Sequence, residues 1–287
     1  MAGKRLLNFN ASDFLSATPM ELKQAILASE GRTIMAENVP GSPLLLGATN
    51  AEYEAHAGAD LLMFNALDLF DPEIACVPEG LEENPISWVK RACGRAIGVN
   101  LEPVDDQTEM VETRVELPVG RRVSIKTLER ANELGFDFVC LTGNPGTGVS
   151  NASIAHSVRV VKEHFNGLVI AGKMHGAGVD EPVMTLEIAK SFIELGVDIL
   201  LVPAPYTAPH FQEQDLREIC DYVYKFNEGK PIEEKVLVLA AKAAGAHLQH
   251  IGDSFNGCCL PENIWTLGVA IRGLRHQLAM TSRSVIR

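Results

Sequence analysis

The sequence predicts an α/β protein, a single (β/α)8 TIM-barrel-like domain over residues 1–287, and three observations indicate this fold class. Four helical runs end in glycine, a spacer and a polar residue before an apolar strand, in the phrases AGAD, LGFD, LGVD and AGAH. The apolar runs that follow do not alternate with polar residues, which is typical of parallel strands covered on both faces. The sequence has no GxGxxG turn after its first strand, which favours a barrel over an open doubly wound sheet.

The expected elements alternate along the chain, which predicts a parallel sheet with short connections. Strands are predicted near residues 33–37, 60–65, 96–101, 137–142, 167–172, 198–202 and 247–252. Helices are predicted near residues 19–29, 49–57, 82–93, 124–134, 151–165, 183–195, 211–227, 232–244 and 261–280. Expected N-caps are Thr18 (before Pro19), Ser124 and Asn151, and expected left-handed glycines after helices are Gly58, Gly135, Gly196 and Gly245.

Two segments are harder to place. Residues 236–239 could be the eighth strand, but charged residues around them recur with helical spacing, so a helix is predicted over residues 232–244. Residues 104–123 contain no clear strand or helix, and their length predicts an insertion that forms a lid or hairpin over the site.

Composition and charge restrict the class of partner. The formal net charge of −12 disfavours nucleic acid but permits a small anionic metabolite. No apolar run is long enough for a membrane span or a signal peptide, so a cytoplasmic location is expected. The six cysteines have no zinc-site spacing and are expected to be reduced thiols. The apolar stripe on the final predicted helix, which includes Ile271 and Leu274, predicts a homo-oligomer.

Polar residues follow the predicted strands, and in a parallel barrel the strand carboxyl ends surround the ligand. Packing gives no reason for polar residues at each of these ends, so they are candidates for ligand binding. His247 and His250 lie three apart on one strand and so point to opposite faces, and His250 is taken as the one that faces the pocket. The candidate ligand-binding residues at these ends are Asn65, Asn100, Thr142, Asn144, His250, Asp253 and Ser254.

The glycine-rich loop GNPGTGVSN is the strongest single motif. Gly146, Thr147, Gly148 and Ser150 lie just before a predicted helix, where free amide groups suit a phosphate or carboxylate. The alternative is a tight turn in which Asn151 only caps the helix.

Lys173, His175 and Glu102 are the candidate catalytic residues. Lys173 directly follows an apolar strand, so it could hold an anion, form a Schiff base or pair with a carboxylate. His175 lies two residues further on and could move a proton. Glu37, Asp68 and Glu102 come from neighbouring strand ends and could together bind Mg²⁺, the only cofactor predicted.

The phrases GSP, AGAD and GVNLE, together with the strand-end residues, resemble those of phosphate-binding TIM-barrel enzymes. The chain is weakly similar to phosphoenolpyruvate phosphonomutase-like and BtpA-like barrel proteins, in architecture over most of its length. The resemblance implies a barrel that binds a phosphorylated ligand. The chain lacks the aspartate-rich metal strand and the GYG-type loop of the phosphonomutase relatives, so no catalytic residue is carried over from them.

The leading hypothesis is an enzyme that acts on a small phosphorylated or carboxylated metabolite. The reaction expected is a lyase or isomerase step through an enolate-like intermediate. Two alternatives stay open, a metal-dependent hydrolase and a non-catalytic metabolite-binding regulatory barrel.

Overall fold

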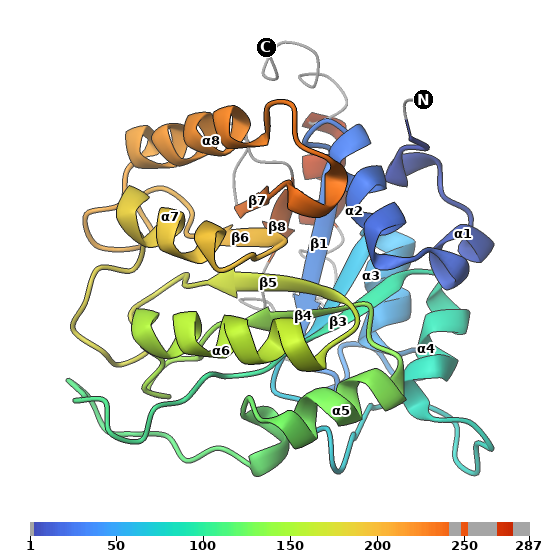
Figure 1. Cartoon of the computed structure of the whole chain (residues 1–287). Helices are drawn as coiled ribbons and strands as arrows, with labels where there is room; N and C mark the ends of the chain where they lie inside the picture. Colours follow the sequence, from blue (N-terminus) through green and yellow to red (C-terminus); the bar gives the residue numbers. More distant parts are fainter. Residues whose placement is uncertain (1–2, 241–247, 252–268, 278–287) are drawn as a thin grey trace.

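The strands form a closed, parallel barrel in chain order, as predicted. The computed structural model describes residues 3–240, 248–251 and 269–277 (Figure 1). Each strand pairs with the next, and β8 closes the barrel on β1. The strands are β1 (Thr33–Asn38), β2 (Leu61–Phe64), β3 (Ala96–Asn100), β4 (Phe138–Leu141), β5 (Leu168–Gly172), β6 (Ile199–Val202), β7 (Leu237–Ala240) and β8 (Leu248–Ile251).

Helices surround the barrel and connect its strands (Figure 1). The helices are α1 (Ala11–Ser16), α2 (Pro19–Ala28), α3 (Asn50–Ala57), α4 (Pro85–Cys93), α5 (Ile125–Leu134), α6 (Asn151–His164), α7 (Leu186–Glu194) and α8 (Glu213–Asn227). Short 3₁₀ turns are η1 (Leu6–Asn8), η2 (Val119–Arg121) and η3 (Ile232–Glu234). Residues 269–277 are also helical, within the last predicted helix.

Most predicted helix ends are confirmed. Thr18 and Ser124 cap α2 and α5 through their side chains, and Gly58, Gly135 and Gly196 have positive φ after α3, α5 and α7. The cap of α6 is Ser150, which accepts from the Ser153 amide at 3.0 Å, so the prediction of Asn151 as the cap is wrong by one residue. Gly245 lies outside the described residues.

The predicted helix over residues 232–244 is wrong in its described part. Residues Ile232–Glu234 form η3, and Leu237–Ala240 form β7, the strand that the prediction lacked. Of the charged residues that indicated helical spacing, Glu233, Glu234 and Lys235 precede the strand, and Lys242 lies outside the described residues. Val236 and the four residues of β7 are all buried, as expected for a strand between two parallel neighbours.

The barrel interior is apolar along most of its length. Alternate residues of the strands point inward, among them Met35, Met63, Cys140, Ile170 and Leu239. At the amino-terminal end, residues of η1, α1 and α2 pack onto the same apolar cluster and close the barrel there. Ligand access must therefore come from the carboxyl ends of the strands.

The aspartates of the recurring phrase fasten neighbouring strands together at the amino-terminal end. Each aspartate accepts a hydrogen bond from the backbone amide of the second residue of the preceding strand. Burial raises the pKa of Asp60 and of Asp137, although a neighbouring basic side chain lowers it in each case. The bonds run from Ile34 N to Asp60 Oδ2 (2.8 Å), from Ile97 N to Asp137 Oδ2 (2.8 Å) and from Val169 N to Asp198 Oδ2 (3.0 Å).

A basic side chain neutralises each of these aspartates. Arg275 contacts Asp60, Lys90 lies 2.8 Å from Asp137, and Lys23 lies 2.9 Å from Asp198. The Lys23–Asp198 pair is almost completely buried, with side chains 1% and 2% exposed. The repeated phrase is therefore a structural device of the barrel wall.

The apolar stripe of the last helix packs on the barrel in its described part. Ile271 is fully buried in the main core cluster, beside Gly58. Arg275 donates to the carbonyls of Arg32 and Gly58. The burial of Ile271 within its own chain removes this residue as a reason to predict a homo-oligomer, and the oligomer itself stays a prediction.

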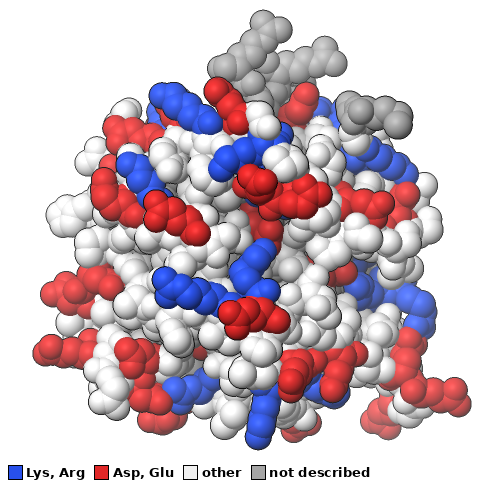
Figure 2. Space-filling model, viewed as in Figure 1, with Lys and Arg blue, Asp and Glu red and all other residues white. Residues whose placement is uncertain are grey.

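On the face drawn in Figure 2, acidic and basic side chains are interspersed, and no broad basic surface is visible there. Within the described ranges, no helix is both long and apolar enough to cross a membrane.

Candidate functional site

The top of the barrel interior is polar, in contrast to the apolar layers below it. Glu37, Asn65, Asn100 and His250 each lie two or four residues beyond an inward-facing apolar residue on the same strand, so they also point inward. These four residues are at most 9% exposed. The choice of His250 as the inward-facing histidine is consistent with this placement.

Glu37 and His250 form a buried pair between β1 and β8, which are neighbours in the barrel. The His250 Nε2 atom lies 2.7 Å from Glu37 Oε2. The other ring nitrogen, Nδ1, is buried and has no hydrogen-bond partner in the described part of the chain. An ionised Glu37 fixes the ring with Nε2 protonated, which leaves a lone pair on Nδ1.

Three asparagine amides continue from Glu37 across the barrel mouth. Asn65 donates to Glu37 Oε1 at 2.7 Å, and Asn65 and Asn144 exchange two amide hydrogen bonds of 2.9 and 3.0 Å. Asn100 donates to Asn65 Oδ1 at 3.1 Å. Glu37, Asn65, Asn100 and Asn144 therefore form one hydrogen-bonded network from four consecutive strand ends.

Glu102 ends this network. Its Oε2 accepts the Asn144 backbone amide, and its Oε1 accepts both the Asn144 side chain and Arg121 Nη2, each at 2.8 Å. The Glu102 backbone also forms hydrogen bonds with residues 121–123. The two ends of the 104–123 segment therefore lie side by side, next to Glu102. Both carboxylate oxygens of Glu102 are thus occupied by donors within the chain.

The 104–123 segment contacts the loops after β4 and β5, and its role as an insertion or lid stays a prediction. It is the teal to green excursion at the lower left of Figure 1, at the opposite end from α1. Val111 donates to the Gly178 carbonyl at 3.0 Å, and Val115 donates to the Gly146 carbonyl at 2.7 Å. A Cβ atom on Gly148 would clash with the Arg114 guanidinium.

The glycine loop is arranged differently from the predicted anion cradle. The Thr147 amide donates to the Asn144 carbonyl and the Gly148 amide donates to the Ala177 carbonyl, so neither is free for an anion. The Thr147 hydroxyl also bonds Asn144, at 2.7 Å, and Ser150 caps α6. The glycines instead allow the 104–123 segment to approach closely. Thr142 lies half-buried beyond the end of β4.

Lys173 is buried beside the amino-terminal end of α6. Its Nζ lies 2.8 Å from Glu181 Oε1, and the same oxygen accepts the Asn151 amide at 2.6 Å. Lys173 is 1% exposed, whereas the Glu181 side chain is 23% exposed. A carboxylate of the chain therefore holds the place where an anion would meet both a lysine and a helix amino terminus. His175 accepts the Ala177 amide on Nδ1 at 3.1 Å.

The described residues do not bring Glu37, Asp68 and Glu102 together as one metal-ligand group. Asp68 accepts the Phe70 amide at 2.9 Å and lies against Gly120, away from the amide network. The oxygens of Glu37 and Glu102 accept hydrogen bonds from nitrogen donors. This donor set does not fit Mg²⁺, which prefers carboxylates free to bind it. Asp253 and Ser254 lie outside the described residues.

A second carboxyl group lies buried behind Glu37. Glu54, on α3, is fully buried and accepts a hydrogen bond from Asn38 Nδ2 at 2.6 Å. Burial, with a smaller contribution from the Glu37 charge, raises the pKa of Glu54 to about 8. A pKa raised to about 8 favours the neutral carboxylic acid form of Glu54 at pH 7.

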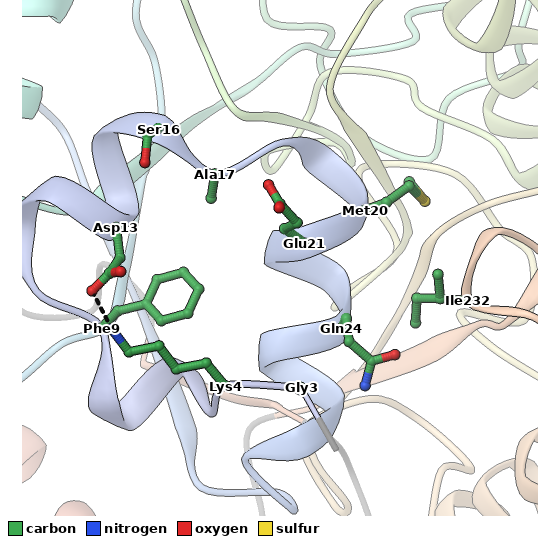
Figure 3. A pocket seen from close by; sticks show the side chains of 10 residues that line it. All are labelled: Gly3, Lys4, Phe9, Asp13, Ser16, Ala17, Met20, Glu21, Gln24 and Ile232. Carbon is green, nitrogen blue, oxygen red and sulfur yellow. Dashed lines mark hydrogen bonds and ion pairs between the residues drawn. The ribbon is translucent and has the colours of Figure 1, made fainter. Parts of the chain in front are cut away.

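A cavity of about 490 Å³ lies at the other end of the molecule, between residues that flank η1, helices α1 and α2, and Ile232 of η3 (Figure 3). Its lining includes Phe9 and Met20, together with Lys4 and Asp13, which form an ion pair of 2.6 Å on one side (Figure 3). These residues belong to the segment that closes the amino-terminal end of the barrel. Residues at that end of a barrel contribute to stability, so this cavity is not the candidate active site.

Sequence reasoning missed three residues that the structure places at or beside the site. Arg121 lies at the end of the predicted insertion, and Glu181 lies in the loop after Lys173. Glu54 lies in a helix that contains one other acidic residue, Glu52. The one available signal for Glu54 was that it falls on the helix face that packs on the strands, where a charge is unexpected.

One family model covers nearly the whole chain. The domain of unknown function DUF7916 matches residues 7–230 and 232–287. The chain belongs to this family. A comparison with curated proteins gives no match.

Solved structures show the likeness to TIM-barrel enzymes that the sequence predicted, at the level of the fold. A mutant flavocytochrome b2 with bound pyruvate is 10% identical, with a TM-score of 0.50 over 88% of this chain and 66% of that chain. Oxaloacetate acetylhydrolase with oxalate is 12% identical, with a TM-score of 0.49 over 93% and 89%. Phosphonopyruvate hydrolase with oxalate and Mg²⁺ is 14% identical, with a TM-score of 0.47 over 93% and 88%. This chain spans just under two thirds of the flavocytochrome chain's length.

Proposed function

We propose that this protein is an enzyme that moves a proton on a small carboxylated or phosphorylated metabolite, in lyase or isomerase chemistry through an enolate-like intermediate. The observation that carries the proposal is the Glu37–His250 pair at the carboxyl end of the barrel. A carboxylate that orients an imidazole, with the second ring nitrogen left as a base, is the usual arrangement for general base catalysis.

In the proposed step, His250 Nδ1 takes a proton from the carbon next to a carbonyl or carboxyl group. The electron pair of the broken C–H bond forms the carbon–carbon double bond of the enolate, and the carbonyl oxygen takes the negative charge. Glu37 stabilises the imidazolium that forms on His250. The imidazolium then returns the proton to the other face of the same carbon, which inverts that centre. Alternatively, the enolate re-forms the carbonyl and expels a leaving group on the next carbon, and this group departs with the proton that His250 gives back.

Lys173 is the group proposed to hold the anionic part of the metabolite or the enolate oxygen. Its buried ammonium and the amino terminus of α6 both favour a negative charge at the place now taken by Glu181. In this proposal the Glu181 side chain moves away from Lys173 when the anionic group of the ligand binds in its place. Glu102 keeps Asn144 and Arg121 in position, because both of its oxygens are already occupied. His175 is the second candidate for moving a proton.

No step of the proposal passes through Mg²⁺, because the oxygens of Glu37 and Glu102 are taken by protein donors. Chelation should therefore leave activity unchanged. Activity that is lost on chelation and regained with Mg²⁺ would favour the metal-dependent hydrolase instead.

Exchange of substrate protons with solvent deuterium tests the proposal even while the product is unidentified. The full chain is incubated in D₂O with a panel of small 2-oxo acids, hydroxy acids and sugar phosphates, and deuterium incorporation is followed by NMR. Reversible proton removal predicts incorporation at one carbon of at least one compound. His250→Asn should abolish it, and Lys173→Met should reduce it.

The matched control is His156→Gln, because His156 is exposed on α6, away from the strand ends. This control should exchange at the wild-type rate. Exchange that persists in His250→Asn would remove His250 from the mechanism. Ligand-induced stabilisation with no exchange and no product from the panel would favour a non-catalytic metabolite-binding barrel.

A further inference from the structure

The two carboxylates of the network fix the direction of its hydrogen bonds. Ionised Glu37 and Glu102 only accept, so the amide atoms that face them must be nitrogens. Asn65 therefore presents Nδ2 to Glu37, and Asn144 presents Nδ2 to Glu102. The Ala66 amide donates to Asn65 Oδ1 at 2.8 Å, which fixes the same orientation of Asn65 independently.

The orientation of Asn100 follows from that of Asn65. Asn65 Oδ1 faces Asn100 and only accepts, so Asn100 must present its nitrogen to it, as the 3.1 Å contact shows. The Asn100 oxygen is then the end of the network. Asn100 Oδ1 is buried and has no donor in the described part of the chain, although the residue as a whole is 2% exposed.

A buried acceptor without a donor is rare in a folded protein and indicates a missing partner. Asn100 points into the barrel mouth from β3. His250 points into the same mouth from β8, three strands away, and its Nδ1 also has no partner among the described residues. Two inward-facing residues that are each at least nine-tenths buried thus present unpaired acceptors to the same end of the barrel. A partner for these atoms must itself carry hydrogen-bond donors.

We infer that the ligand of this site carries a hydroxyl group and donates it to Asn100 Oδ1. The inference rests on the proposed function, in which His250 Nδ1 is kept for the proton that moves. It narrows the metabolite to hydroxylated carboxylates and hydroxylated phosphates, and makes Asn100 a specificity-determining residue. A metabolite that has the anionic group but no hydroxyl leaves Asn100 Oδ1 unpaired and binds more weakly.

Matched pairs of probes test this inference. L-malate is compared with succinate, L-lactate with propionate, and ribose 5-phosphate with 2-deoxyribose 5-phosphate. Binding to the full chain is measured by the shift in thermal unfolding midpoint and by titration calorimetry. We expect that in at least one pair the hydroxylated member binds about tenfold or more tightly, since a site built to bond a hydroxyl rejects the analogue that lacks it.

The Asn100→Ala variant should remove this discrimination and leave the affinity for the weaker member of the pair unchanged. The control is Asn166→Ala, because Asn166 is exposed after α6, and it should discriminate as the wild type does. The wild-type comparison stands by itself if Asn100→Ala does not fold. Equal binding within each pair, no binding in any pair, or discrimination that persists in Asn100→Ala would overturn the inference.

The deuterium exchange assay separates failure of this inference from failure of the proposed function. Exchange on a compound without a hydroxyl, bound as tightly as its hydroxylated partner, would overturn the role of Asn100 and leave the function standing. Hydroxyl-dependent binding without exchange would confirm Asn100 and contradict the enzyme.

Discussion

The buried Glu54 predicts a loss of stability as the pH rises, and Glu54→Gln should remove that loss. When Glu54 is ionised, its carboxylate oxygen Oε1 has no hydrogen-bond donor in the described residues. The side-chain oxygen of Asn38, Oδ1, also has no donor there. A protonated carboxyl group supplies a hydroxyl donor for such an acceptor. Glutamine keeps the shape and the hydrogen-bonding capacity of the neutral acid but does not ionise between pH 4 and 9.

The sign follows from the two states. In the unfolded chain Glu54 ionises near its ordinary pKa of 4.5, whereas in the folded chain its pKa is raised to about 8. Between these values the folded state binds more protons, so the free energy of unfolding falls as the pH rises. The loss begins near pH 4.5 and is complete above pH 8.

The size follows from the same two values. A tenfold change in proton affinity is worth about 1.4 kcal/mol, so the full difference corresponds to roughly 5 kcal/mol. Relaxation around a buried charge reduces this figure, and a loss of roughly 3 kcal/mol or more is expected. Burial raises the pKa of Asp60 and Asp137 in the same direction, but both residues are present in wild type and variant and cancel in the comparison.

Urea unfolding of wild type and Glu54→Gln at pH 5.5 and pH 8.5 measures the effect. The wild type should lose stability relative to the variant between the two conditions. Glu129→Gln is the matched control, because Glu129 is exposed on α5, and it should follow the wild type. Parallel pH dependence of wild type and Glu54→Gln would refute the reasoning, because Glu54 would then ionise alike in the folded and unfolded chains.

Three further predictions concern the barrel wall, the 104–123 segment and the oligomer. Asp198→Ala should lower the free energy of unfolding by about 3–5 kcal/mol, because it leaves the buried Lys23 ammonium without its carboxylate. Asp106→Ala, at an exposed ion pair, should lower it by no more than ~1 kcal/mol. Equal urea midpoints of the two variants would contradict this prediction. Gly148→Ala should speed proteolysis within residues 104–123 more than Gly47→Ala does. Both glycines have positive φ, but of the two only Gly148 faces a neighbouring side chain. Equal cleavage rates would argue against close packing of residues 104–123 on Gly148. Sedimentation velocity of the full chain tests the predicted homo-oligomer, and a monomer at micromolar concentration would contradict it.

The sequence predicted the barrel because its local signals are strong. Glycines with positive φ, Ser and Thr caps and unbroken apolar strands act within a few residues of where they occur. β7 was missed because a buried strand of four residues that follows three charged ones resembles a helix in its spacing. Only its pairing with β6 and β8 settles its identity.

The site was predicted in part, for a related reason. Strand-end positions identified Glu37, Asn65, Asn100 and His250 as candidates, and the facing of His250 alone was predicted. Their mutual hydrogen bonds depend on barrel register and on rotamers, which a sequence pattern does not encode.

The wrong expectations concern partners that the residue pattern did not reveal. The glycine loop looked like an anion cradle, but its amides bond the chain itself. For Lys173 an ion pair with a carboxylate was one of three open alternatives, and Glu181 is the partner that the pattern did not identify. In both cases the competing partner, and not the residue type, decides what is available to a ligand.

The tautomer of His250 tests the account most directly, because the proposed base is its Nδ1 lone pair. Nitrogen NMR of histidine-labelled protein at pH 8, assigned through the signal that His250→Asn removes, distinguishes a protonated from an unprotonated ring nitrogen. The account predicts a protonated Nε2 and an unprotonated Nδ1. A proton on Nδ1 with a bare Nε2 would contradict the Glu37–His250 hydrogen bond and the proposed role of His250 as a base.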